Sequence, residues 1–178
     1  DEAVRALRAA IGHETRLGPW RDRWTALHAE LRAWYWGRAL PVDFRGVDAV
    51  GTPDDLERAY RQRRGPTLPA DAIDAAVIAA RAVPDEARAR LFGDLDAART
   101  LAAELVGGRV VPDELRDLEA ILIDEVQDLT LVEALVCVLV ARRPAVTTGS
   151  RPAFHVAGDE GQTVRATDFD WGELKDLI

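Results

Sequence analysis

The feature that most constrains the fold is a strand–helix–strand pattern in the last third of the chain. Two short apolar runs, Ala120–Ile123 and Phe154–Ala157, flank one long apolar segment, Leu131–Ala141. The short runs have the length of buried strands, and the middle segment is long enough for a deeply packed helix. A strand, a helix and a strand in this order imply a right-handed crossover and a parallel pair of strands. The pattern predicts an α/β architecture whose first strand is covered on both faces.

A sheet of only two parallel strands would leave its edges unpaired and would not be stable alone. Further strands must therefore come from residues 41–50, from polypeptide beyond this chain, or from a partner copy. Apolar residues alternate in residues 41–50, which indicates a short strand or an extended loop. Self-association is thus one expected way of covering the sheet edges.

Residues 1–117 are predicted to form a mainly helical subdomain. Apolar residues recur at helical spacing in five segments: 1–11, 20–36, 53–64, 69–82 and 84–106. Thr52 followed by Pro53 and two acids is a typical helix start, because a hydroxyl caps the first turn. Gly107-Gly108 is a typical helix end. One or two further helical turns are expected between Pro112 and Leu118.

Two groups of side chains in this helical part have both a structural and a functional interpretation. Trp20, Trp24 and Trp34 share a helical face, where they would pack in the core or, alternatively, stack on bases. Three arginines within residues 61–64 close a helix, where they would interact with its C-terminal carbonyls or contact phosphates. We favour the structural interpretation for both groups.

Composition limits the cellular locations and the binding partners that we expect for the chain. The 178 residues carry a formal net charge of −8, and the arginines are scattered among acids, so composition alone does not indicate a strong nucleic-acid binder. No apolar run approaches the length of a membrane span and no signal peptide is visible. The single cysteine, Cys137, excludes a disulfide within the chain. We expect a cytoplasmic protein with no membrane partner, and, because the chain has no Met, one that is processed or cut from a longer polypeptide.

Acidic and amide side chains follow both predicted strands. Asp124 and Glu125 come directly after the first strand, and residues 158–162, GDEGQ, follow the second. Neighbouring parallel strands end at the same edge of a sheet, so the two segments would face one pocket. An acidic pair at a strand end is typical of nucleotide-hydrolysing sites, and a polar turn after a buried strand is the structural alternative.

The sequences IDEVQD (residues 123–128) and VAGDEGQT (residues 156–163) resemble motifs II and III of the superfamily 1 DNA helicases of the UvrD/Rep type. In that family each motif ends a core strand of a RecA-like ATPase domain. The resemblance covers residues 118 to about 171. It implies an α/β fold class with part of a RecA-like P-loop NTPase domain over residues 118–178, and a 1B-like helical insertion over residues 1–117.

The resemblance also implies a role for each matching residue. Asp124 would be the metal-binding residue for Mg²⁺, and Glu125 would act as general base toward the attacking water or orient it. Gln162 would sense the γ-phosphate of ATP, and Gln127 and Asp159 would belong to the nucleotide site. Gln127 and Asp128 would lie behind the residues that contact the nucleotide, as supporting or coupling residues.

Two departures from the family pattern accompany these matches. No phosphate-cradling GxxxxGK[ST] sequence exists in the chain, whose only lysine is Lys175, so the chain alone is expected neither to bind ATP tightly nor to hydrolyse it. The segment after motif III also differs. Phe169 and Trp171 would stack on single-stranded DNA from a shifted position, or would anchor this segment in the core.

The sequence therefore predicts a fragment of an ATP-dependent helicase that moves along single-stranded or forked DNA. The alternative is a degenerate helicase-like module that serves protein interaction without nucleotide chemistry. A metal-dependent nuclease that uses the same acids is a weaker third hypothesis, because no further carboxylates stand out as its ligands.

Overall fold

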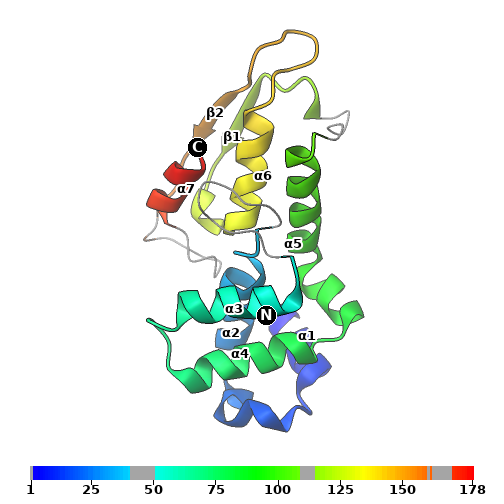
Figure 1. The fold of residues 1–178 in the computed structure, drawn as a ribbon, viewed down its shortest axis with the longest axis vertical. Coiled ribbons are helices and arrows are strands. Elements are labelled where there is room, and N and C mark those ends of the chain that lie inside the picture. Colours follow the sequence, from blue (N-terminus) through cyan, green and yellow to red (C-terminus); the bar gives the residue numbers. More distant parts are fainter. Residues whose placement is uncertain (1, 41–50, 109–114, 160, 162–169) are drawn as a thin grey trace.

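A computed structural model describes residues 2–40, 51–108, 115–159, 161 and 170–178. The molecule is mixed α/β and mostly helical, and it is elongated, with α5 running from the helical end toward the sheet (Figure 1). Its elements are α1 (Glu2–Ile11), η1 (Thr15–Asp22), α2 (Trp24–Glu30), η2 (Leu31–Trp36), α3 (Pro53–Arg64), α4 (Ala70–Ala82), α5 (Asp85–Val106), β1 (Ala120–Ile123), η4 (Val126–Asp128), α6 (Leu131–Ala141), β2 (Ala153–Val156) and α7 (Trp171–Leu177).

The helices predicted within residues 1–117 are confirmed, and the second of them differs from the prediction. That helix is shorter than predicted and continues from α2 into η2, a stretch of π-helix. Thr52 caps α3 as predicted, because its hydroxyl oxygen accepts a hydrogen bond of 3.1 Å from the Asp55 N–H. The predicted turns before residue 118 fall largely outside the described residues; residue 115 is in a 3-10 helical conformation, and residues 116–117 form a turn. None of the described helices combines the length and apolar character that crossing a bilayer would require.

The tryptophan side chains pack in or against the core, which agrees with the structural interpretation of this helical face. Trp24 is buried, and Trp20 and Trp34 pack against the core from its margin. Two guanidinium groups, those of Arg38 and Arg64, lie over the Trp34 ring, each with its Cζ 4.2 Å from the ring centroid. Such stacking satisfies the cations while it shields the ring from water.

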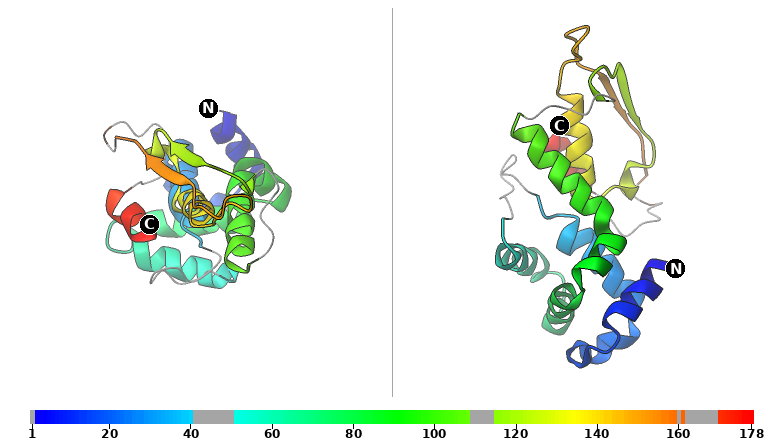
Figure 2. Two further views of the ribbon diagram at one scale, coloured as in Figure 1. Left: turned by 90° about the horizontal axis from the view of Figure 1, so that it is seen from above. Right: turned by 90° about the vertical axis from the view of Figure 1, so that its right-hand side faces the viewer.

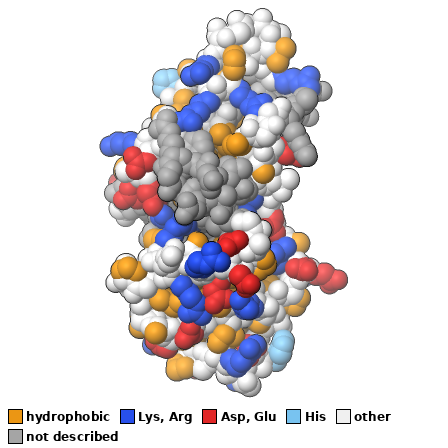
Figure 3. Space-filling view, in the orientation of Figure 1, with side chains coloured by type: hydrophobic (Ala, Val, Ile, Leu, Met, Phe, Trp, Pro, Cys, Tyr) orange, Lys and Arg blue, Asp and Glu red, His pale blue; other side chains and the backbone are white. Residues whose placement is uncertain are grey.

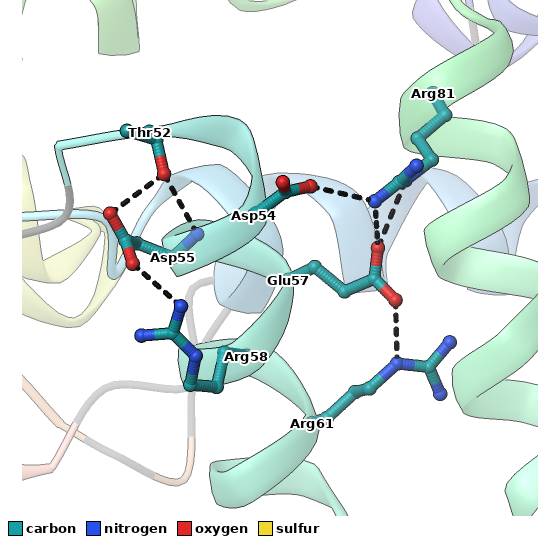
Figure 4. Close-up of polar contacts among 7 residues, drawn as sticks. All are labelled: Thr52, Asp54, Asp55, Glu57, Arg58, Arg61 and Arg81. Atoms are coloured by element: carbon teal, nitrogen blue, oxygen red, sulfur yellow. Dashed lines mark hydrogen bonds and ion pairs between the residues drawn. The ribbon is translucent and has the colours of Figure 1, made fainter.

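The arginines at the end of α3 also have structural roles. Arg64 pairs with Glu30 at 2.7 Å, and Arg61 pairs with Glu57 and Asp74, each at 2.8 Å. Figure 4 shows the ion-pair network between α3 and α4 in which Glu57 also receives Arg81. Figure 3 accordingly shows acidic and basic side chains intermixed rather than gathered by sign in this half of the molecule.

The predicted parallel pair is confirmed. β1 and β2 pair with Ala120 opposite Ala153 and Ile123 opposite Val156, and within the described residues they are the whole sheet. The expectation that β1 is covered on both faces is wrong. α6 covers one face (Figure 2), and on the other Leu122 is 77% exposed. Residues 41–50, one expected source of a further strand, lie outside the described residues.

The helical part and the α/β part share one core. α5 packs along α6, and Leu174 and Leu177 of α7 are buried in the same cluster as Leu95 of α5. Arg142, just after α6, donates hydrogen bonds to the carbonyls of Leu177 and Ile178, at 2.8 and 2.7 Å. α7 is therefore held by both packing and hydrogen bonds at the sheet end of the molecule.

Candidate functional site

The candidate site lies where β1 and β2 end. The N–H of Ala157 donates to the carbonyl of Ile123 at 2.8 Å, and the N–H of Val126 donates to the carbonyl of Ala157 at 3.0 Å. These two hydrogen bonds continue the strand pairing beyond the last paired residues of the sheet. The segments that carry Asp124 and Asp159 therefore leave the sheet side by side, as the sequence predicted.

The acidic pair after β1 is exposed and sits on an unusual backbone. Glu125 has φ 53° and ψ 44°, and it is the only non-glycine residue with positive φ in the described part of the chain. A left-handed conformation costs an L-residue roughly 1–2 kcal/mol. One Asp124 carboxylate oxygen accepts the Glu125 N–H at 2.9 Å and so supports this turn. The turn presents both carboxylates to solvent at the edge of the sheet.

Gln127 joins the two segments. Its side chain is fully buried, its amide nitrogen donates to Glu125 Oε2 at 2.5 Å, and its amide oxygen accepts the N–H of Asp159 at 3.0 Å. A buried amide that satisfies both its donor and its acceptor in this way fixes the relative position of the groups it touches. Gln127 therefore fixes the Glu125 side chain relative to the segment after β2, and its role in coupling stays a prediction.

Gly158 makes the close approach of Gln127 possible. A Cβ atom at this position would lie 2.3 Å from Gln127 Oε1 and 2.8 Å from Val126 Cγ1, which is closer than atoms can pack. Sequence reasoning included Gly158 in the motif but gave it no role. A glycine directly after a strand is the signal that pointed to such a close contact.

The remaining predicted site residues are distributed as follows. Asp159 is exposed, and one of its carboxylate oxygens accepts the N–H of Gly161 at 2.8 Å. Gln162 and Phe169 lie outside the described residues. Trp171 begins α7, where it is half-buried and packs against the core.

The donor groups present determine which metal sites the chain can form. In the described part of the chain, no three His, Cys, Asp or Glu side chains gather in an arrangement that could hold an ion. Mg²⁺ is commonly held by one or two carboxylates together with water and substrate phosphates. Exposed Asp124 fits that arrangement when a nucleotide supplies the other ligands.

Comparisons of the chain with protein-family models, curated proteins and solved structures found no match.

Proposed function

We propose that the chain is part of an ATP-dependent DNA helicase or translocase of superfamily 1, and that residues 118–178 belong to its first RecA-like domain. The observation that carries this proposal is the Gln127 amide, which connects Glu125 to the Asp159 backbone. Two motifs that the resemblance assigns to one ATPase site therefore touch each other across two parallel strand ends.

Each carboxylate in the turn would have a separate role. Asp124 would hold Mg²⁺, which when bound neutralises the charge on the phosphates of ATP. Glu125 would accept a proton from the attacking water. Its Oε2 accepts a hydrogen bond from the Gln127 amide and its side chain is exposed, so Oε1 would be the oxygen that accepts the proton.

The strained turn at Glu125 supports a functional site. Residues in sparsely populated conformations gather at active sites, where the surrounding structure holds a side chain in a required position. Here the position is held by the Asp124 carboxylate and by Gln127. Gln162 would contact the γ-phosphate, and its displacement on hydrolysis would reach Glu125 through Asp159 and Gln127.

The test is the Glu125→Gln variant of the intact protein that contains this chain. DNA-stimulated ATP hydrolysis should fall by about a thousandfold or more, because the base is lost, while the Kd for ATP changes little. The matched control is Glu119→Gln. Glu119 is exposed and directly precedes β1, at the opposite end of the strand from Glu125, so this variant should retain full turnover. Unchanged turnover in Glu125→Gln would show the mechanism to be wrong.

A protein-interaction module without nucleotide chemistry is the second candidate function. The absence of GxxxxGK[ST] from these 178 residues and the net charge of −8 favour it. The coding sequence upstream of Asp1 discriminates the two: a phosphate-binding loop there supports the helicase, and its absence supports the module. Calorimetric titration of this chain alone with ATP should give no tight binding on either proposal.

A further inference from the structure

A small cavity lies among η2, α3, α4 and α5, away from the strand ends. Its volume is about 260 Å³. The side chains that matter for its chemistry are those of Tyr35, Trp36, Leu56, Arg81, Arg88 and Arg99. Aromatic and aliphatic groups form part of the wall, and the guanidinium groups, the Thr52 hydroxyl and the Asp85 carboxylate supply its polar part, a mixture found in sites for small polar molecules.

Two of the arginines come from α5. Arg88 and Arg99 lie on either side of the break in α5 at Phe92, and both line this cavity. Both also line a larger hollow of about 810 Å³, which continues along α5 past Thr100 to Gly107. The two arginines thus lie where the smaller cavity meets the larger hollow.

These two arginines lack well-formed anionic partners. The Nε atoms of both are buried and have no hydrogen-bond partner. The nearest carboxylates to Arg88, those of Asp96 and Asp85, lie at 3.5 and 3.8 Å, longer than hydrogen bonds. Among the residues that the structure describes, Arg99 forms no ion pair, and burial lowers its pKa, with Arg88 adding to that effect and Asp96 opposing it.

Arg81 shows the contrast within the same cavity. Its guanidinium lies 2.6 Å from Glu57 and 3.1 Å from Asp54, so its charge is already neutralised (Figure 4). A buried cation without such compensation destabilises the fold unless an anion joins it. Asp85 also lines the cavity and lies 3.8 Å from Arg88, whose side chain is 42% exposed, so the uncompensated buried charge resides on Arg99, with Arg88 only weakly paired beside it.

We propose that this cavity binds the phosphate group of a small phosphorylated molecule through Arg88 and Arg99. Guanidinium groups bind phosphate oxygens in pairs with matched geometry. The walls formed by Tyr35 and Trp36 suit an apolar or ring-shaped remainder of the molecule. The size of the cavity and the overall charge of −8 favour a small ligand over a polyanion such as nucleic acid. The site does not depend on the helicase proposal.

The experiment is a titration of the whole chain with inorganic phosphate at constant ionic strength, with chloride in its place as the reference. Calorimetry should show saturable binding, and the Tm should rise by about 3 °C at a phosphate concentration roughly ten times the Kd. Arg99→Gln and Arg88→Gln should each weaken phosphate binding by about tenfold or more, because each removes one charged hydrogen-bonding group. Arg58→Gln, on the outer side of α3, should bind phosphate as the original protein does.

A second readout separates a binding role from a structural one. Without phosphate, Arg99→Gln should melt at the same temperature as the original protein or higher, because it removes a buried charge that has no partner. A lower Tm for Arg99→Gln in chloride would assign Arg99 to folding and overturn the proposal. So would equal phosphate binding by the variant and the original, or binding of a single-stranded oligonucleotide without binding of phosphate.

Discussion

Gln127 shows how one side chain can connect two motifs that are remote in sequence. A glutamine in a polar turn after a strand is ordinarily exposed. Here it is buried, and it spans from the Glu125 carboxylate to the Asp159 backbone, passing so close to Gly158 that a Cβ atom there would overlap its amide oxygen. Changes at Gly158 should therefore disturb Glu125, although the two residues follow different strands.

Gly158→Ala tests this arrangement. The added Cβ would lie 2.3 Å from Gln127 Oε1, so either the amide or the backbone must shift. We expect a loss of about 1–3 kcal/mol in the free energy of unfolding, measured by urea denaturation. Gly93→Ala in α5 is the control: its added methyl group would meet no atom within 4 Å, and the change should stabilise by about 0.5–1 kcal/mol. Equal stability of Gly158→Ala and the original protein would contradict the contact.

His28 gives the fold a dependence on mildly acidic pH. Its Nε2 is buried without a hydrogen-bond partner and its ring stacks on Phe92, with centroids 5.4 Å apart. Burial, and to a smaller extent the charge of Arg32, lowers the pKa of His28 from the usual 6.5, while Asp94 opposes the shift. The unfolded chain therefore takes up a proton at a pH where folded His28 stays neutral.

The stabilisation associated with neutral His28 is present above pH 6.5 and is lost as the pH falls toward the lower pKa of the folded state. The free energy of unfolding should accordingly decline between about pH 7 and pH 5. His28→Phe should flatten this decline, as measured by denaturation at a series of pH values, whereas His13→Gln, at an exposed position, should leave it intact. A decline of the same slope in His28→Phe would assign the effect to other groups.

At the residue scale, the sequence predicted which residues lie at the strand ends better than it predicted the contacts between them. The acids after β1 and the glycine–acid pair after β2 were found because strand ends of one sheet share an edge. The left-handed backbone of Glu125 and the burial of Gln127 were not predicted, because both depend on how the segment after β2 packs against η4. That packing is tertiary and leaves no local pattern in residues 123–128.

β1 and β2 are the elements in which the structure departs most from expectation. An uninterrupted apolar run predicted a strand covered on both faces. In the described structure Ile123 and Val156 face the core, while the alternate residues, including Leu122 and His155, face outward. The sequence of β1 resembles that of an interior strand, but α6 covers only one face of the β1–β2 sheet.

Matched substitutions on neighbouring positions of β1 test this assignment of faces. Leu122→Thr should change the free energy of unfolding by less than about 0.5 kcal/mol, because its side chain is already exposed. Ile123→Thr should lower the free energy of unfolding by about 1–3 kcal/mol, because it places a hydroxyl against the core.

The same pair of variants reports on self-association: if a second copy covers the outer face, Leu122→Thr should lower the apparent mass in sedimentation. Similar losses of stability in both variants would mean that both faces are covered.

Helices were predicted more reliably than their internal irregularities. α3, α4, α5 and α6 were predicted to within two residues, because capping residues, glycines and a clear apolar face mark their bounds. The π-helical stretch in η2 and the break in α5 at Phe92 were not predicted. Phe92 is buried against Trp36, with ring centroids 4.3 Å apart, so the break accompanies an aromatic contact between distant helices.

At the scale of the molecule, the shared core argues against independent unfolding of the two predicted parts. α5 packs against α1 at one end and against α6 at the other. Denaturation followed by tryptophan fluorescence, which reports mainly on the helical end, should coincide with the labelling of Cys137 in α6. The thiol is suited to this use because burial, with the nearby charge of Glu133, raises its pKa and slows its reaction in the folded state. Two separated transitions would show that residues 1–117 and 118–178 fold separately.

The open face of the β1–β2 sheet has a consequence for the exchange of amide protons with solvent. The ladder contains four residue pairs, joins positions more than thirty residues apart, and is covered on one side only. Its opening exposes little apolar surface compared with the separation of α5 from α6, so its amides should exchange at a smaller free energy of opening. The strand ends that carry Glu125 and Asp159 can then be rearranged while the helical end stays folded.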